Sequence, residues 1–485
     1  MNRGFGLACA LLLAGYGGFL LRYTSFSVGG SDSSGYLNTA QRLVSGTLVS
    51  RPRTLERFAL PDEPLQIFIP LGFVEGPRPG TMAPYYASGF PAHMAAVALL
   101  LGWEHGPFLV SPLAALGSVL LLYLLAREVS LPRAWAGAVA AVFAAWPVLI
   151  YQAIQPMSDA VATFWALAAV LCAIKARQRL VFAAASGAAV GIAVLVRPTS
   201  VLLVVPLAFA LPLSLKAISL FLGGGVPFAA ALAVYDLRCY GDVLQSGYGK
   251  AGVREAIALR NFSPRLRHYG GWILSTVTPL VPMAWLGLLF DRKPAWRNRA
   301  LILSWFGSFF LFYCLYEPYD SFAFVRFLLP AVPGLFLGAV ITVHDLVERL
   351  AWPRLTEPIS IALLLLVLFV EGRAVRRVGI LGTAEGESIY PRICAWAART
   401  LPADAVVLSM SASGALEYYT TLSYARYDWI QPEQFPQLRA SFERRGGRVY
   451  ALLFPYEVED LARRLPGHWK KLGVLRDVTL WKLED

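Results

Sequence analysis

Residues 31–40 read Ser-Asp-Ser-Ser-Gly-Tyr-Leu-Asn-Thr-Ala, and they follow closely on an apolar run at residues 7–21 that covers most of a membrane span. Apolar side chains recur at helical spacing from this stretch onward, which predicts a short amphipathic helix. Either Ser31 or Ser33 would cap this helix. Asp32 would then lie at its positive end, where an ionised carboxylate is stabilised. Such a carboxylate beside the membrane is suited to act as a catalytic base; the simpler interpretation is that Asp32 only caps the helix.

The composition is that of a protein with many membrane spans. Of the 485 residues, 57% are hydrophobic and 15% are charged, whereas soluble domains carry roughly 25% charged residues. The net charge of +12 therefore points to cytoplasmic loops and lipid headgroups as partners, and not to nucleic acid. The five cysteines are scattered, with no CxxC pair, so neither a disulfide framework nor a zinc site is indicated.

About eleven spans are predicted, because a span needs about 20 apolar residues. They cover residues 4–23, 108–126, 134–151, 160–174, 182–196, 200–213, 217–235, 271–290, 300–316, 327–343 and 359–370. The short basic loops fall on one side of this arrangement, which places the N-terminus in the cytoplasm. Residues 24–107, with amphipathic helices, then form the first loop on the outer side. The C-terminal region is outside as well, where Cys394 would be reachable.

The composition becomes that of a soluble domain after residue 371. Helices are expected at residues 388–400, 413–419 and 457–464, and strands at residues 405–410, 448–454 and 478–482. This alternation predicts a small α/β domain. The chain is therefore divided into a membrane domain, residues 1–371, and an extracytoplasmic α/β domain, residues 372–485.

Several polar side chains near the ends of the predicted spans are candidates for a site. Arg197 and Arg326 lie at outer ends, where a guanidinium group holds phosphate oxygens in a bidentate manner or simply extends to the headgroups. Asp159 lies in a second outer loop. His93 lies in an apolar stretch, where a packed or interfacial role is the simpler interpretation, and Tyr319 belongs to a short polar loop that is solvated by default.

A succession of short motifs runs through residues 1–345: DSSGY at 32–36, YYASGFP at 85–91, QPMSDA at 155–160, LVRP at 195–198, YGDVLQSGY at 240–248, and Tyr319 followed by RFLLP at 326–330. In this order they resemble membrane glycosyltransferases of the GT-C class. The most similar are those related to protein O-mannosyltransferases and to the aminoarabinose transferase acting on lipid A. The sequence lacks a second acid directly after Asp32 and has ASGFP at 87–91 where the latter branch often has Lys-Pro-Pro, which leaves the class of acceptor open.

The resemblance implies a fold with many membrane-spanning helices and an inverting transfer from a polyprenyl-phosphate-linked sugar. The acceptor is a hydroxyl or phosphate of a lipid, glycan or protein at the outer face of the cell membrane. Asp32 is the expected general base. Asp159 is expected to orient the acceptor or, together with Asp32, to bind a divalent metal ion. The expected substrate-binding residues are Tyr36, Tyr86, His93, Arg197, Tyr319 and Arg326.

Two other classes of function remain open. One is a lipid or solute transporter, although transporters usually place ionisable residues at the membrane midplane and show internal repeats. The other is a membrane scaffold whose C-terminal domain binds a partner. Because the charged residues cluster in the outer loops, we favour the glycosyltransferase. A scaffold would leave the Asp32 segment without a role.

Overall fold

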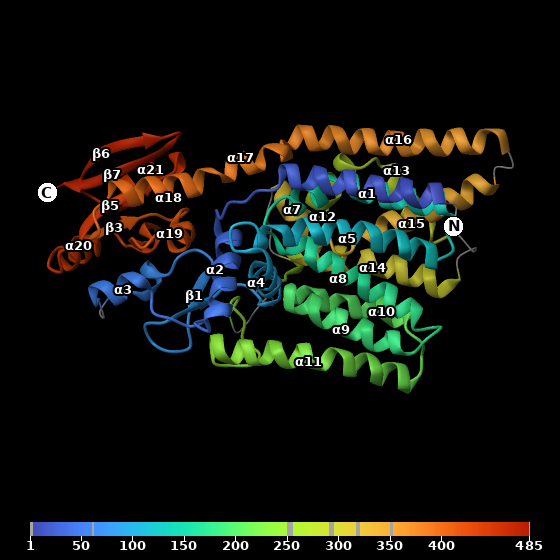
Figure 1. Ribbon diagram of the computed structural model, residues 1–485, viewed down its shortest axis with the longest axis horizontal. Helices are drawn as coiled ribbons and strands as arrows, with labels where there is room; N and C mark the ends of the chain where they lie inside the picture. The colour runs from blue at the N-terminus through green and yellow to red at the C-terminus, as the bar shows by residue number, and fades with distance from the viewer. Residues whose placement is uncertain are drawn as a thin grey trace. The chain divides into compact units, whose positions relative to one another are not determined.

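The computed structural model describes residues 3–60, 63–249, 256–290, 295–316, 321–349 and 353–484. The chain forms two compact units, each built from segments that are far apart in the sequence. The membrane unit contains residues 1–24, 108–232 and 253–383, and the sheet unit contains residues 25–107, 233–252 and 384–485. Figure 1 labels most of their helices and strands. The boundary predicted at residue 371 stays a prediction. Packing groups residues 25–107 with the C-terminal sheet.

The regular elements of the membrane unit are all helices within the described ranges. In chain order they are α1 (Arg3–Tyr23), α5 (Gly106–Glu128), α6 (Arg133–Ala145), α7 (Pro147–Ala153), α8 (Ser158–Lys175), α9 (Val181–Val196), η2 (Pro198–Leu203), α10 (Val204–Ala210), the first part of α11 (Leu215–Tyr240), η4 (Leu259–Asn261), α12 (Phe262–Thr276), α13 (Leu280–Gly287), α14 (Trp296–Leu315), η5 (Phe322–Leu328), α15 (Val332–Arg349), α16 (Pro353–Val378) and η6 (Ile380–Gly382).

Five of the described helices are long and apolar enough to cross a membrane, namely α5, α8, α11, α14 and α16. The number rises to seven if two bent pairs each count as one span: α6 with α7, bent by 62°, and η5 with α15, bent by 75°. The chain is therefore a multi-pass membrane protein, while the predicted count of about eleven spans is not confirmed. The predicted spans at residues 182–196 and 200–213 correspond to two shorter apolar helical segments, Val181–Val196 and Pro198–Ala210.

Prolines account for the interruptions. Pro147 follows the break between α6 and α7, Pro330 lies between η5 and α15, and Pro279 lies between α12 and α13. Proline lacks the backbone N–H that continues a helix, and its ring clashes with the preceding turn. The single span predicted at residues 271–290 is therefore wrong, because two shorter helices share these residues.

The C-terminal part of the sheet unit is the expected α/β arrangement. Its five strands have the order β4-β3-β5-β7-β6. Strand β3 (Ala405–Leu408) pairs in parallel with β4 (Ser423–Ala425) and β5 (Arg448–Leu453), while β7 (Val478–Glu484) is antiparallel to β5 and to β6 (His468–Leu475). Its helices are α17 (Thr383–Glu387), α18 (Ile389–Thr400), α19 (Ser413–Tyr419), η7 (Tyr427–Trp429), α20 (Phe435–Glu443) and α21 (Pro455–Arg464).

The N-terminal part of the sheet unit shares a core with this sheet. It contains α2 (Ser31–Ser45), α3 (Arg53–Phe58), η1 (Leu65–Phe68), the hairpin of β1 (Phe73–Glu75) and β2 (Met82–Pro84), and α4 (Gly89–Leu101). The rings of Phe58 and Phe68 lie 5.7 and 6.4 Å from the ring of Phe442 on α20. These buried aromatic contacts join the segment that carries Asp32 to the C-terminal sheet.

Candidate active site

Asp32 occupies the first turn of α2, as predicted. The predicted serine cap is wrong: the residue before the helix is Gly30, with φ +52°, which has no side chain that could cap the helix. Glycine adopts this left-handed conformation without steric cost. The Ser33 hydroxyl instead bonds to the backbone of Gly29, accepting from its N–H and donating to its carbonyl. Asp32 therefore lies at the positive end of α2 without being its cap residue, and its side chain is half-buried.

Tyr86 holds the Asp32 carboxylate. Its hydroxyl donates a hydrogen bond of 2.5 Å to Asp32 Oδ1 and lies 3.0 Å from the Ser31 hydroxyl. Burial, together with the negative charge of Asp32, raises the pKa of Tyr86 well above its ordinary value, so this hydroxyl keeps its proton and remains a donor. The ring of Tyr36 lies 4.6 Å from that of Tyr86 and 4.9 Å from that of Phe90. The structure thus brings together Asp32, Tyr36 and Tyr86.

A close contact between two glycines sets this geometry. A Cβ atom on Gly35 would lie 2.5 Å from the Tyr86 ring and 2.8 Å from the Cα of Gly72. Gly72 itself has φ +90°, a conformation that favours glycine. Because neither glycine has a side chain, α2 approaches the segment before β1 closely enough for Tyr86 to reach Asp32. The position of Tyr86 is also fixed from the other side, where the Tyr235 hydroxyl donates to its carbonyl at 2.9 Å.

His93 lies on α4 in the sheet unit and is half-buried. Its Nδ1 atom is 2.7 Å from the carbonyl oxygen of Gly89, one turn earlier in the same helix. Tyr319 lies outside the described residues. The roles expected for His93 and Tyr319 as substrate-binding residues stay predictions.

A second group of candidate residues lies in the membrane unit. Asp159 is in the first turn of α8 and is 1% exposed, and its Oδ1 atom forms an ion pair with Arg197, which directly follows α9. The Arg197 guanidinium group lies over the ring of Phe327, 5.1 Å from its centroid. Arg326 lies 5.6 Å from the same centroid, and its Nη1 atom is 3.9 Å from the Met157 sulfur. Asp159, Arg197 and Arg326 are therefore brought together around one aromatic ring.

Sequence reasoning missed a third arginine. Arg265, on α12, is 1% exposed. Tyr269 follows one turn later, and its ring lies 6.5 Å from that of Tyr313. Tyr313 in turn stacks on Phe327 at 5.1 Å. We call Asp159, Arg197, Arg265 and Arg326 the arginine cluster, in which Arg265 is linked to the other three through Tyr269 on its own helix and the rings of Tyr313 and Phe327. Guanidinium groups are suited to bind a phosphate.

The two predicted metal ligands belong to different units, and a metal ion bound by both stays a prediction. Asp32 belongs to the sheet unit and Asp159 to the membrane unit. Among the described residues, the group of possible ligand atoms that lie close together is His344, Asp345 and Glu348 on α15. In that group, the two ring nitrogens of His344 lie 3.0 and 3.3 Å from the two carboxylates. Contacts between these three side chains therefore hold the group together.

The membrane unit also carries an apolar groove formed by α6, α13, α15 and α16. Its lining includes Trp135, Val142, Val281, Phe336, Val340 and Leu364. Such a lining has the chemistry to bind a hydrocarbon chain.

Comparison with known proteins shows similarity in fold. No protein-family model and no curated protein matches the sequence. Among solved structures, ArnT from Cupriavidus metallidurans bound to undecaprenyl phosphate matches with a TM-score of 0.59 and 13% identity, over 99% of this chain and 98% of that chain. The apo form of ArnT gives 0.56 and 14%, over 98% and 96% of the two chains.

The arabinofuranosyltransferase AftD from Mycobacteria matches with a TM-score of 0.56 and 12% identity, over 97% of this chain and 41% of that chain. ArnT and AftD are both GT-C glycosyltransferases. The resemblance identified from the motifs is therefore confirmed at the level of the fold.

Proposed function

Because the chain shares its fold with GT-C glycosyltransferases, we propose that it is a membrane glycosyltransferase that uses a polyprenyl-phosphate-linked sugar as donor. The observation that carries the proposal is the Asp32–Tyr86 pair: a half-buried carboxylate at the positive end of a helix, oriented by a buried hydroxyl. This arrangement is suited to a general base. The acceptor is a hydroxyl or a phosphate on the outer face of the membrane.

The arginine cluster supports a phosphate-bearing donor. Arg197 is fixed by its ion pair with Asp159, and Phe327 packs against both Arg197 and Arg326. Guanidinium groups held in this way bind phosphate oxygens in a bidentate manner. The similar structure of ArnT holds undecaprenyl phosphate, and the apolar groove offers a surface for the isoprenoid chain.

In the proposed reaction, Asp32 acts on the acceptor and the arginine cluster acts on the phosphate of the donor. Asp32 accepts the proton of the acceptor hydroxyl as its oxygen bonds to the anomeric carbon of the sugar. The bond from that carbon to the phosphate oxygen breaks, and polyprenyl phosphate leaves with the electron pair. Arg197, Arg265 and Arg326 offset the negative charge that grows on the leaving phosphate. Attack from the face opposite the phosphate inverts the anomeric configuration.

One observation favours a second candidate, a transporter. Glu371 on α16 is fully buried in the membrane unit, and neither of its carboxylate oxygens has a hydrogen-bond partner among the described residues. Buried ionisable residues inside membrane spans often mark ion or proton pathways. The two candidates differ in whether a bond of the substrate is broken: a transferase cleaves the bond between sugar and phosphate, whereas a transporter leaves the substrate intact.

The test is incubation of the purified protein with a panel of polyprenyl-phosphate hexoses, pentoses and amino sugars, with a membrane extract as the source of acceptor. Release of free polyprenyl phosphate from at least one donor supports the proposal, because it requires cleavage of the bond to the sugar. An Asp32→Asn variant in the same assay controls for contaminating enzymes. Movement of a donor or solute across a vesicle membrane, with no release of polyprenyl phosphate, would instead establish the transporter.

A further inference from the structure

Helix α2 presents two functional faces. Asp32 and Tyr36, one turn apart, face Tyr86. Ser34, Asn38 and Arg42 are also spaced by four residues and so share one side of the helix. At 3.6 residues per turn, residues 32 and 34 are separated by about 200° around the axis. Because both faces belong to one regular helix, contacts that hold the second face also set the direction in which Asp32 points.

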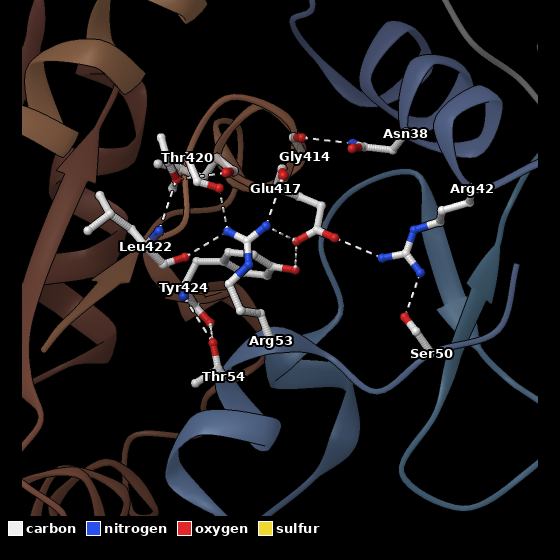
Figure 2. A network of polar contacts seen from close by, with 11 residues as sticks. Asn38, Arg42, Ser50, Arg53, Thr54, Gly414, Glu417, Thr420, Leu422 and Tyr424 are labelled. Atoms are coloured by element: carbon white, nitrogen blue, oxygen red, sulfur yellow. Dashed lines mark hydrogen bonds and ion pairs between the residues drawn. The ribbon is translucent and has the colours of Figure 1, made fainter. Parts of the chain in front are cut away.

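The second face contacts α19 of the C-terminal sheet. The side-chain amide of Asn38 donates to the carbonyl of Gly414 at 3.0 Å, as Figure 2 shows. A Cβ atom on Gly414 would lie 2.1 Å from the Ser34 hydroxyl, so the two helices meet with no room for a side chain at this position. Nearby, the Leu71 N–H donates to the Ser413 hydroxyl at 3.1 Å.

Glu417, one turn further along α19, joins two arginines of the N-terminal segment (Figure 2). Its Oε1 atom accepts from Arg42 Nη2 at 2.8 Å, and its Oε2 atom lies 3.0 Å from Arg53 Nη2. Oε2 also accepts from the Tyr424 hydroxyl at 2.9 Å. The side chains of Glu417 and Arg42 are only 11% and 13% exposed, so solvent screens this ion pair weakly.

The two arginines are fixed by further contacts. Arg53 donates to the carbonyls of Thr420 and Leu422 at 2.7 and 3.0 Å. Arg42 donates to the Ser50 hydroxyl at 2.5 Å, and its guanidinium group stacks on the ring of Phe73. Among the described residues, Glu417 is thus the carboxylate that pairs with both of these oriented cations. Its loss would remove that shared partner from two like charges in a poorly solvated place.

We propose that Glu417 is a positioning residue: by pairing with Arg42 it fixes the rotation of α2, and through α2 it fixes the direction of the Asp32 carboxylate. This inference rests on the proposed function, in which Asp32 is the base. It gives the C-terminal sheet a role in catalysis, although Asp32 and Glu417 lie far apart in the sequence.

The test is a double-mutant cycle of Glu417→Gln, Arg42→Gln and the double variant. Amide hydrogen exchange at residues 31–45 should become faster in each variant. The kcat should fall by about 10- to 100-fold, as expected when a reacting group is misplaced by about 1 Å. The KM for the donor should stay unchanged, because the arginine cluster is intact. The double variant should lose no more activity than either single variant, since the pair acts as one unit.

Asp428→Asn is the matched control. Asp428 pairs with Arg426 in the same unit, and this pair is about as buried as that of Glu417 and Arg42. It should leave both kcat and the exchange of residues 31–45 unchanged. Unchanged exchange at residues 31–45 in Glu417→Gln would overturn the proposal. Faster exchange in a variant whose kcat equals that of the unmodified protein would also overturn it.

Two outcomes are kept distinct. If the unmodified protein releases polyprenyl phosphate from no donor, the proposed function is wrong, and the exchange measurement still decides whether Glu417 holds α2. If Glu417→Gln fails to fold, Arg42→Gln provides the same readouts, because it leaves Glu417 paired with Arg53.

Discussion

The Tyr86 hydroxyl donates a hydrogen bond of 2.5 Å to the Asp32 carboxylate across 54 residues of sequence. The contact depends on α2 and on the close approach of Gly35 to Gly72. It orients the carboxylate that we propose as the proton acceptor. A half-buried acid thereby acquires a defined direction, which an acid in a solvated loop does not have.

Tyr86→Phe removes this hydrogen bond and keeps the ring that packs on Tyr36. Hydrogen bonds to charged groups contribute about 1.5–3 kcal/mol, so kcat should fall about 10- to 100-fold while thermal stability changes little. Tyr418→Phe, in the same unit, serves as the control and should retain full turnover. Unchanged turnover in Tyr86→Phe would show that this contact does not orient the base.

Arg326→Ala should weaken binding of a polyprenyl-phosphate donor more than Arg326→Lys does, because lysine keeps the charge and loses only the bidentate geometry. Titration of each variant with the polyprenyl-phosphate donor measures this difference in affinity. Arg179→Ala, at an exposed position after α8, is the control. Affinity equal to that of the unmodified protein in both Arg326 variants would mean that the guanidinium group only extends to the headgroups.

Gly35→Ala should lower both thermal stability and turnover. The new Cβ atom would lie 2.5 Å from the Tyr86 ring, and overpacking of this kind costs about 1–3 kcal/mol. Gly137→Ala is a sharp control, because Gly137 is also helical and its Cβ atom would meet no atom within 4 Å. That variant should be slightly stabilised, by up to about 1 kcal/mol. Equal melting temperatures for the two variants would contradict the proposed close approach of α2.

The sheet unit should face the outside of the cell. Cys394, expected from the sequence to be reachable there, is fully buried, and burial raises the pKa of its thiol to about 12, so it reacts poorly with thiol reagents. A cysteine-free variant carrying Asp477→Cys, at an exposed turn, should be labelled by an impermeant reagent in intact cells. Arg179→Cys should be labelled only after permeabilisation. The reverse pattern would invert the topology.

Local patterns in the sequence predicted much of the fold. The expected positions are confirmed for helices α2, α18, α19 and α21 and for strands β3, β5 and β7. Each of these elements has its own periodicity or apolar run. Strands β4 and β6 and helix α20 were missed. The breaks at Pro147, Pro279 and Pro330 were not anticipated, since a hydrophobic run of sufficient length was interpreted as a continuous span.

The candidate site was predictable only where a motif marked a residue. Asp32, Tyr36 and Tyr86 belong to two such motifs and lie together, as do Asp159 and Arg197. Arg265 is one of several arginines in a polar segment, and only tertiary burial distinguishes it from the others. Glu417 pairs with Arg42 across 375 residues, a separation over which no local pattern carries information.

Replacement of Asp32 by asparagine decides whether this carboxylate is the base. Asparagine keeps the shape and an oxygen that accepts from Tyr86, and it removes the charge that takes up the proton. Turnover of the active donor with its acceptor should fall about 10² to 10⁴-fold, while expression, melting temperature and donor affinity hold. Asp32→Asn that turns over donor at the rate of the unmodified protein would contradict the account, and the search for the base would move to Asp159.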